Sequence, residues 1–226
     1  MKIAVLGTGM VGRALAARFV EIGHEVSMGT RDPEATLARA QPDGMGNPPL
    51  FAWLAEHPRV AVASFADAAA RSELVVNATN GAASLEALAL AGEAALAGKV
   101  LLDVSNPLDF SHGMPPTLFV SNTDSLAEQI QRAFPAARVV KSLNTMTAAL
   151  QASPAQLADG DHSVFVSGND DEAKATVTRL LASLGHTDVI DLGDIETARG
   201  AEMLMPIWLR LWGALGTGLF NYKIVR

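Results

Sequence analysis

The chain opens with a short apolar run, residues 2–6, that leads directly into the turn Gly7-Thr8-Gly9-Met10-Val11-Gly12. A helical pattern follows over residues 11–22, and a second apolar run begins at Glu25. A strand, a glycine-rich turn and a helix in this order, within about thirty residues, are typical of a dinucleotide-binding βαβ unit.

The three glycines of this turn have different expected tasks. Gly7 permits a tight turn, and Gly12 lets the helix pack closely on the strand. Gly9 has no Cβ, so a diphosphate can approach the backbone amides at the positive end of the helix. The alternative is a tight turn that binds nothing.

Apolar runs rich in β-branched residues alternate with helical stretches along the whole chain, which predicts an α/β fold with a doubly wound, mostly parallel sheet of the Rossmann type. We expect a single domain over residues 1–226, with a core dinucleotide-binding region at 1–150. Extra strands and a short helical C-terminal extension, bent near Pro206, are expected at 160–226. The expected strands are residues 2–6, 25–29, 60–63, 74–78, 100–104, 138–142, 163–167 and 188–192.

Composition excludes several classes of function. The net charge of -7 disfavours binding to nucleic acid, and the absence of cysteine removes thiolate and iron-sulfur chemistry. The five histidines are scattered singly, so we expect no metal site. The apolar stretch 203–220 contains Pro206 and Arg210, which argues against a membrane span. Met1 leads into a strand pattern without a signal peptide, so a cytoplasmic location is expected.

The tip of the second strand reads Gly29-Thr30-Arg31-Asp32-Pro33. A guanidinium on Arg31 can grip a 2'-phosphate and the Thr30 hydroxyl can add a donor, which favours NADP(H). The competing interpretation makes Asp32 the acid that binds the ribose in NAD-dependent proteins. Asp32 precedes a proline and a helical pattern at 34–40, so we expect it to cap that helix instead.

Small polar residues follow three further strands, and ligands of doubly wound sheets bind at such carboxyl ends. Each segment alone could be an ordinary turn. Lys141 could act as a general acid or lie with its stem along apolar surface. With no dedicated acid-base pair, we predict no catalytic side chain and hydride transfer by positioning alone. The predicted cofactor-binding residues here are Asn77, Ala78, Thr79, Asn80, Ser105, Asn106, Pro107, Asn144, Thr145 and Met146.

Several segments resemble the NADPH-dependent reductases of the deazaflavin coenzyme F-420 (8-hydroxy-5-deazaflavin:NADP oxidoreductases). The resemblance rests on the glycine turn, the Gly29-Thr30-Arg31 tip and the segments 139–146, 166–170 and 198–223, and it covers nearly the whole chain. It implies hydride transfer between NADP(H) and a deazaflavin bound at the carboxyl end of the sheet.

The same resemblance implies that Asn144, Thr145 and Met146 flank the reacting rings and that a second-cofactor pocket contains Trp208, Leu215 and Gly216. A homodimer through the C-terminal helices is also expected. Asn144 stands where the archaeal enzymes tend to carry histidine, and the loop 41–58 is longer here. Similar domains occur in membrane-embedded ferric and cupric reductases. An NADPH-dependent flavin or ferric-chelate reductase and a non-catalytic NADPH-binding regulator therefore remain alternatives.

Overall fold

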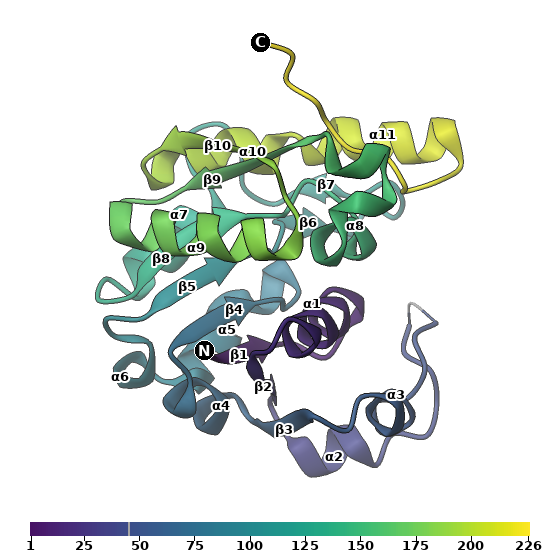
Figure 1. Cartoon of the computed structure of the whole chain (residues 1–226), viewed down its shortest axis with the longest axis vertical. Coiled ribbons are helices and arrows are strands. Elements are labelled where there is room, and N and C mark those ends of the chain that lie inside the picture. Colours follow the sequence, from purple (N-terminus) through teal and green to yellow (C-terminus); the bar gives the residue numbers. More distant parts are fainter. Residues whose placement is uncertain (45) are drawn as a thin grey trace.

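The computed structural model describes residues 1–44 and 46–226. Eight strands form one sheet in the order β10-β9-β8-β5-β4-β1-β2-β3 (Figure 1). The strands of this sheet are β1 (Lys2–Leu6), β2 (Glu25–Thr30), β3 (Val60–Ser64), β4 (Leu74–Asn77), β5 (Val100–Asp103), β8 (Arg138–Ser142), β9 (Ser163–Ser167) and β10 (Asp188–Gly193).

All pairings from β3 across to β8 are parallel, so the carboxyl ends of six strands lie at one edge. The order reverses between β1 and β4, and the crevice at such a reversal is where ligands bind in doubly wound sheets. β9 runs antiparallel to β8 and β10 runs parallel to β9. The predicted fold class is confirmed, including the continuation of the sheet beyond its six-strand core.

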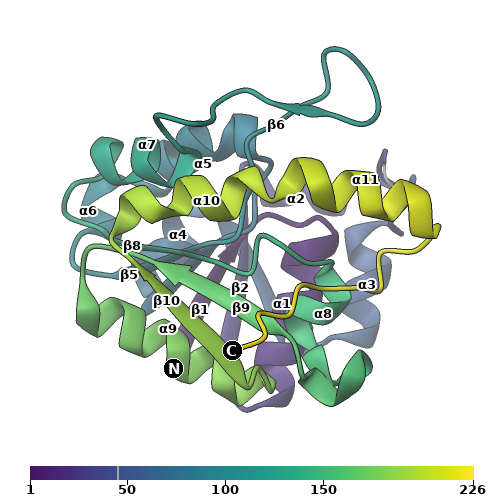
Figure 2. The same ribbon diagram turned by 90° about the horizontal axis from the view of Figure 1, so that it is seen from above.

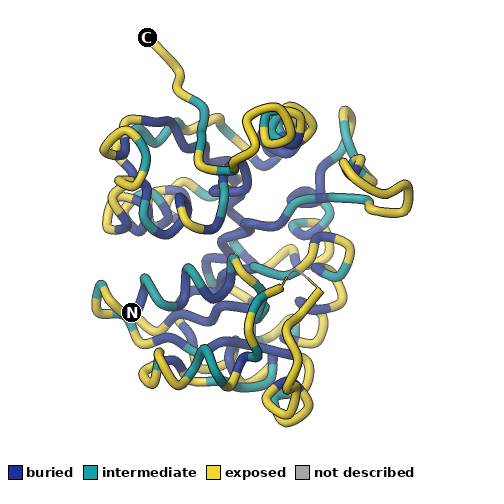
Figure 3. The backbone as a smooth tube through the Cα atoms, turned by 90° about the vertical axis from the view of Figure 1, so that its right-hand side faces the viewer, coloured by how far each residue is buried: buried dark blue, intermediate teal, exposed yellow. Residues whose placement is uncertain are grey.

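Two apolar clusters, one on each face, hold helices against the sheet (Figure 2). On one face lie α1 (Met10–Glu21), α8 (Ala148–Ala152) and α9 (Asp171–Leu184), and on the other lie α4 (Phe65–Arg71), α5 (Ser84–Ala91), α6 (Glu93–Leu96) and α7 (Leu126–Ala133). Every residue of β4 and β5 is buried, as expected for strands covered on both sides. Figure 3 shows that buried backbone concentrates in this central layer.

The remaining elements include several that the periodicity did not reveal. The segment 41–58, expected to be a loop, contains α3 (Leu50–Glu56), and a small hairpin of β6 (Leu108–Asp109) and β7 (Thr117–Leu118) projects from the domain (Figure 2). Helix α2 (Pro33–Leu37) begins as predicted, because the Asp32 side chain accepts a hydrogen bond from the Ala35 N–H at 2.9 Å. Short 3-10 turns occur at Gly81–Ala83, Pro154–Gln156, Ala158–Gly160 and Ile195–Thr197 (η4).

The C-terminal extension consists of α10 (Ala198–Met203) and α11 (Met205–Leu215), which break at Leu204, close to the predicted bend at Pro206. Proline is tolerated there because it lies in the first turn of α11. None of the helices in the two described stretches of chain has the length and apolar character needed to cross a membrane. The outer side of α11 is apolar but exposed, at Ile207, Trp212 and Leu215.

Two histidines lie under the C-terminal tail. The His162 and His186 rings meet edge to face at 6.2 Å, and both residues are buried. The His186 Nε2 pairs with the Gln151 carbonyl at 3.1 Å. Burial lowers the pKa of His186 to about 4, with the neighbouring His162 acting in the same direction and the Gln151 carbonyl opposing. His186 is therefore neutral in the folded protein at neutral pH.

This neutral histidine predicts a pH-dependent loss of stability. An unfolded His186 titrates near pH 6.5, so between pH 6.5 and 4 the unfolded chain binds the extra proton and the free energy of unfolding falls as the pH falls. The full contribution is about 3 kcal/mol, reached below pH 4. Urea unfolding of His186→Gln from pH 7.5 to 4.5 should show a shallower decline than the unmodified chain, whereas exposed His112→Gln should match it. A decline of equal slope in His186→Gln would contradict this assignment.

Candidate functional site

The glycine turn lies where the carboxyl end of β1 meets the first turn of α1. Gly7 has a φ of +115°, which glycine alone adopts without strain, and its N–H donates to the Gly29 carbonyl at 2.9 Å. A Cβ on Gly12 would overlap the Gly7 carbonyl oxygen, whereas a Cβ on Gly9 would meet no atom within 4 Å. The space at Gly9 is thus open beside the amino end of the helix, where a diphosphate would fit.

Thr30 is the last residue of β2 and Arg31 follows it, and the two side chains lie in different environments beside this turn. Thr30 is buried, and its hydroxyl lies 2.8 Å from that of Thr36, which donates in turn to the Asp32 carbonyl at 2.7 Å. Arg31 extends to Glu86 on α5, with 2.9 Å between nitrogen and oxygen, and both side chains are more than 60% exposed. Exposed ion pairs contribute little to stability, so an anionic ligand can compete with Glu86 for the Arg31 guanidinium.

Asn77 at the end of β4 is fully buried and holds neighbouring strand ends together. Its amide nitrogen donates to the Asp103 carboxylate at 2.8 Å and to the Ser84 hydroxyl at 3.0 Å. Its amide oxygen accepts from the Thr79 hydroxyl at 2.7 Å. The Ser105 hydroxyl donates to the same Asp103 oxygen at 2.7 Å. These hydrogen bonds fix the backbone of the strand ends and leave the Asn77 side chain little capacity for a ligand.

Lys141 at the end of β8 is the centre of a buried ion cluster. Its Nζ lies 2.8 Å from both the Asp103 and the Glu202 carboxylates and donates to the Ser105 carbonyl at 2.6 Å. Glu202, on α10, also accepts from the first two N–H groups of α7 at 2.8 and 3.1 Å. Burial alone would lower the pKa of Lys141, but the two carboxylates outweigh it and the pKa is raised.

The structure therefore contradicts both interpretations of Lys141 from the sequence, a general acid and a lysine with its stem along apolar surface. Its side chain is 0% exposed and all three ammonium protons have acceptors, so it is not placed to act as a general acid. Its partners are charged, so it is not a lysine that merely lays its stem along apolar surface. The structure corrects both interpretations to a buried ion cluster that ties α10 to the sheet edge.

The loops after β5 and β8 are joined by a reciprocal pair of amides. Asn106 donates to the Asn144 carbonyl at 2.8 Å, and Asn144 donates to the Asn106 side-chain oxygen at 2.9 Å and to the Ala201 carbonyl at 3.0 Å. Thr145 and Met146 follow directly and are buried. The amide pair holds both loops in place over the carboxyl edge, beside α10.

Burial divides the predicted cofactor-binding residues into two groups, although the fold brings both to the same edge of the sheet. The buried members are Gly12, Thr30, Asn77, Ser105, Pro107, Asn144, Thr145 and Met146. The members with accessible surface are Gly7, Thr8, Gly9, Met10, Val11, Arg31, Ala78, Thr79, Asn80 and Asn106. Their contacts with a dinucleotide stay a prediction.

The residues expected to form a second-cofactor pocket are only partly brought to this edge. Trp208 stacks with both Trp212 and Phe220, with ring centroids 6.2 and 5.2 Å away. A Cβ on Gly218 would lie 2.7 Å from Thr147 and 3.7 Å from Trp208, so the end of the chain packs on the turn that follows Met146. Leu215 and Gly216 lie at the exposed end of α11. The role of Trp208, Leu215 and Gly216 remains a prediction.

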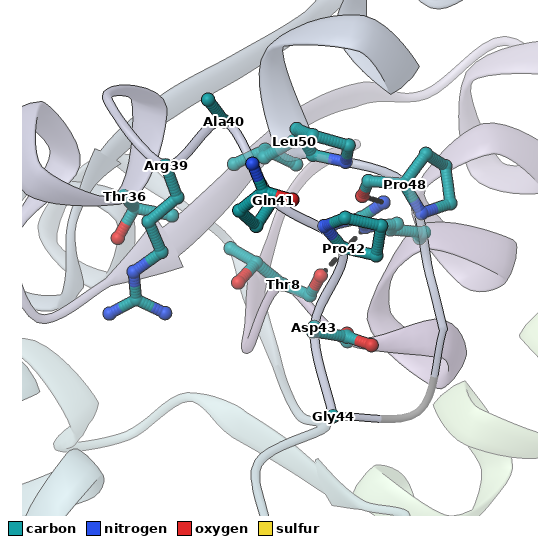
Figure 4. Close-up of a pocket in the computed structure, with 13 residues that line it drawn as sticks. Thr8, Thr36, Arg39, Ala40, Gln41, Pro42, Asp43, Gly44, Pro48 and Leu50 are labelled. Atoms are coloured by element: carbon teal, nitrogen blue, oxygen red, sulfur yellow. Dashed lines mark hydrogen bonds between the residues drawn. The ribbon is translucent and has the colours of Figure 1, made fainter.

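Sequence reasoning missed Arg13, which connects the glycine turn to the segment before α3. Arg13 is buried, and its guanidinium donates to the Thr8 carbonyl at 2.8 Å and to the Pro48 carbonyl at 2.6 Å. A cavity of about 440 Å³ lies beside it, bounded by Thr8 and Gly9 on one side and by Thr36, residues 39–44 and residues 48–50 on the other (Figure 4). The sequence did contain a signal for this role, because Arg13 is a charged residue on the otherwise apolar side of α1, directly after Gly12.

An open phosphate turn at the switch point of a doubly wound sheet defines a dinucleotide-binding protein of the Rossmann class. The family model of coenzyme F420-dependent NADP oxidoreductases matches residues 2–107. The F420-dependent NADP reductase of Methanothermobacter marburgensis is 30% identical, over 93% of this chain and 92% of its own length. A solved structure from Arthrobacter sp. FB24, described as a candidate F420-dependent NADP reductase, is 67% identical, covers 100% of both chains and has a TM-score of 0.96.

The chain belongs to the F420-dependent NADP reductase family, as its sequence led us to expect, and its class is that of NADP-dependent oxidoreductases. Metalloreductase STEAP3 of Rattus norvegicus is 33% identical over 97% of this chain, which spans only 40% of the length of that protein. The likeness to a metalloreductase therefore concerns one part of a longer protein.

The contrast between Gly9 and Gly12 predicts separable effects on binding and folding. Gly9→Ala adds a methyl group in open space and should leave the free energy of unfolding within about 0.5 kcal/mol, while it weakens NADPH binding because the methyl occupies the diphosphate position. Gly12→Ala pushes against the Gly7 carbonyl and should destabilise the fold by about 1–3 kcal/mol. Urea unfolding and NADPH fluorescence titration measure the two effects. Unchanged NADPH affinity in Gly9→Ala would refute the diphosphate position.

The ion cluster predicts a large stability loss when Lys141 is removed. Lys141→Met leaves two buried carboxylates facing each other and should cost about 3–5 kcal/mol in urea unfolding. The matched control, Lys223→Met, breaks the ion pairs of a partly exposed lysine and should cost less than about 1 kcal/mol. Adding Glu202→Gln to Lys141→Met should restore part of the loss. Equal costs for the two lysines would contradict the cluster's importance.

Proposed function

We propose that this protein transfers a hydride between NADP(H) and the deazaflavin coenzyme F420. The full-length match to the M. marburgensis reductase and to the Arthrobacter structure carries this proposal. The open space at Gly9 fits the diphosphate, and exposed Arg31 fits the 2'-phosphate that distinguishes NADP from NAD.

The polar network at the carboxyl edge supports a reaction that needs little proton chemistry from side chains. Lys141, Asp103 and Glu202 are buried and paired with one another, and the nearby amides are hydrogen-bonded to each other. When both cofactors are bound, C4 of the nicotinamide would supply the hydride, C5 of the deazaflavin would accept it, and solvent would supply the accompanying proton. The task of the protein is then to hold two rings in contact and to exclude side reactions.

A flavin or ferric-chelate reductase is the second candidate. It is favoured by the 33% identity to metalloreductase STEAP3 across 97% of this chain. Both candidates share the NADPH site and differ only in the acceptor.

We also propose a homodimer in which the exposed apolar side of α11 is covered by a second copy. Ile207, Trp212 and Leu215 are each more than 40% exposed, an arrangement that favours association.

A paired turnover assay tests the proposed function. NADPH and NADH are each mixed with coenzyme F420, FMN and a ferric chelate, and the absorbance of each acceptor is followed. We expect NADPH to reduce F420 at least about tenfold faster than NADH does, because one charged contact to the 2'-phosphate is worth this much. Turnover with FMN or the ferric chelate alone would support the second candidate. Binding of NADPH without turnover of any acceptor would contradict both candidate functions and would favour a non-catalytic NADPH-binding regulator.

A further inference from the structure

We propose that Arg39 is a second cation for the 2'-phosphate of NADPH and helps to set the preference for NADPH over NADH. The proposal rests on NADPH being the dinucleotide that this protein binds. It assigns a specificity-determining role to a residue outside the Thr30-Arg31 tip, and it places the phosphate in the cavity between the glycine turn and the segment after α2.

The cavity begins at the glycine turn itself. Thr8 and Gly9 form one wall, and Thr36 and Arg39 lie together on a second wall (Figure 4). Thr8 also borders a smaller depression that contains Thr30 and Arg31. A dinucleotide that follows the turn past Thr8 therefore has Arg31 on one side and Arg39 on the other.

The hydroxyl groups of Thr30 and Thr36 already donate their protons to hydrogen bonds within the protein. Thr36 donates to the Asp32 carbonyl, which can only accept, so the shared hydrogen bond between the two hydroxyls must use the Thr30 proton. Both residues are 8% exposed. In this arrangement neither hydroxyl has a proton to offer a phosphate, and the donors must come from elsewhere.

The arginines around the turn differ in what they already bind. Arg13 is used by the Thr8 and Pro48 carbonyls, and Arg31 is paired with Glu86. Arg39 is exposed, and within residues 1–44 and 46–226 its guanidinium has neither an ion pair nor a hydrogen bond. It is the guanidinium of this cavity whose five donors remain free for a ligand.

The charge of the chain makes such a cation necessary. With a net charge of -7 the surface as a whole repels a dianionic phosphate, so binding depends on cations placed locally. A 2'-phosphate has enough oxygens to accept from two guanidinium groups at once. One of them, Arg31, must first be released from Glu86, whereas Arg39 needs no such exchange.

Calorimetric binding to the full chain tests the proposal with Arg39→Ala, Arg31→Ala and the double variant. Arg59→Ala is the matched control, because it removes the same charge from an exposed arginine. Arg59 lies directly before β3, at the amino end of that strand and not at its carboxyl end. The probes are NADPH against NADH, and adenosine 2',5'-bisphosphate against ADP.

We expect Arg39→Ala to weaken NADPH and the 2',5'-bisphosphate about tenfold, while NADH and ADP change less than about twofold. Arg39→Lys should keep part of the affinity for NADPH, because lysine retains the positive charge but lacks the planar guanidinium that can donate two parallel hydrogen bonds. The double variant should bind NADPH no better than NADH.

Two results would overturn the role of Arg39 and leave the proposed function intact. One is an Arg39→Ala variant that matches Arg59→Ala, and the other is an equal loss for NADPH and NADH. If the unmodified chain binds neither NADPH nor the 2',5'-bisphosphate, the proposed function fails together with this inference.

Discussion

The ammonium of Lys141, held between Asp103 and Glu202, is the interaction on which the candidate site depends. It joins the ends of β5 and β8 to α10, and Glu202 extends the contact to the start of α7. A lone buried charge would be very costly, but here the ammonium is paired with both carboxylates, and Glu202 also accepts from two N–H groups of α7. Helix α10 therefore helps to hold the carboxyl edge of the sheet in place. The loop that carries Asn144 is fixed through the same helix.

The close approach of α1 to the glycine turn is the second constraint. It leaves no room at Gly12, but it leaves open space at Gly9, where a ligand would lie. At Gly12 the helix touches the Gly7 carbonyl so closely that no side chain fits, while Gly9 faces open space. Beyond the turn, the buried side chains of Asn77, Lys141 and Asn144 all have hydrogen-bond partners. A rigid edge of this kind suits a reaction in which two rings are held in contact, because the protein has little else to supply.

Sequence periodicity located every strand of the main sheet to within one residue, because each is a compact apolar run. It missed α3, which follows a segment rich in glycine and proline, and the hairpin of β6 and β7, whose two-residue strands have no period to detect. It could not give the direction of β9, since an alternating or apolar strand reads the same whether its neighbour is parallel or antiparallel.

The sequence by itself determined the glycine turn, the doubly wound fold and the family, since these depend on local patterns and on motifs in a fixed order. Only the tertiary structure decided which polar residues face inward. Asn77, Asp103 and Lys141 are far apart in the chain and meet because parallel strands end at one edge, and α10 brings Glu202 to the same place. Whether Asn77 faces a ligand or a buried carboxylate depends on its neighbours in space, and local sequence carries no information about those neighbours.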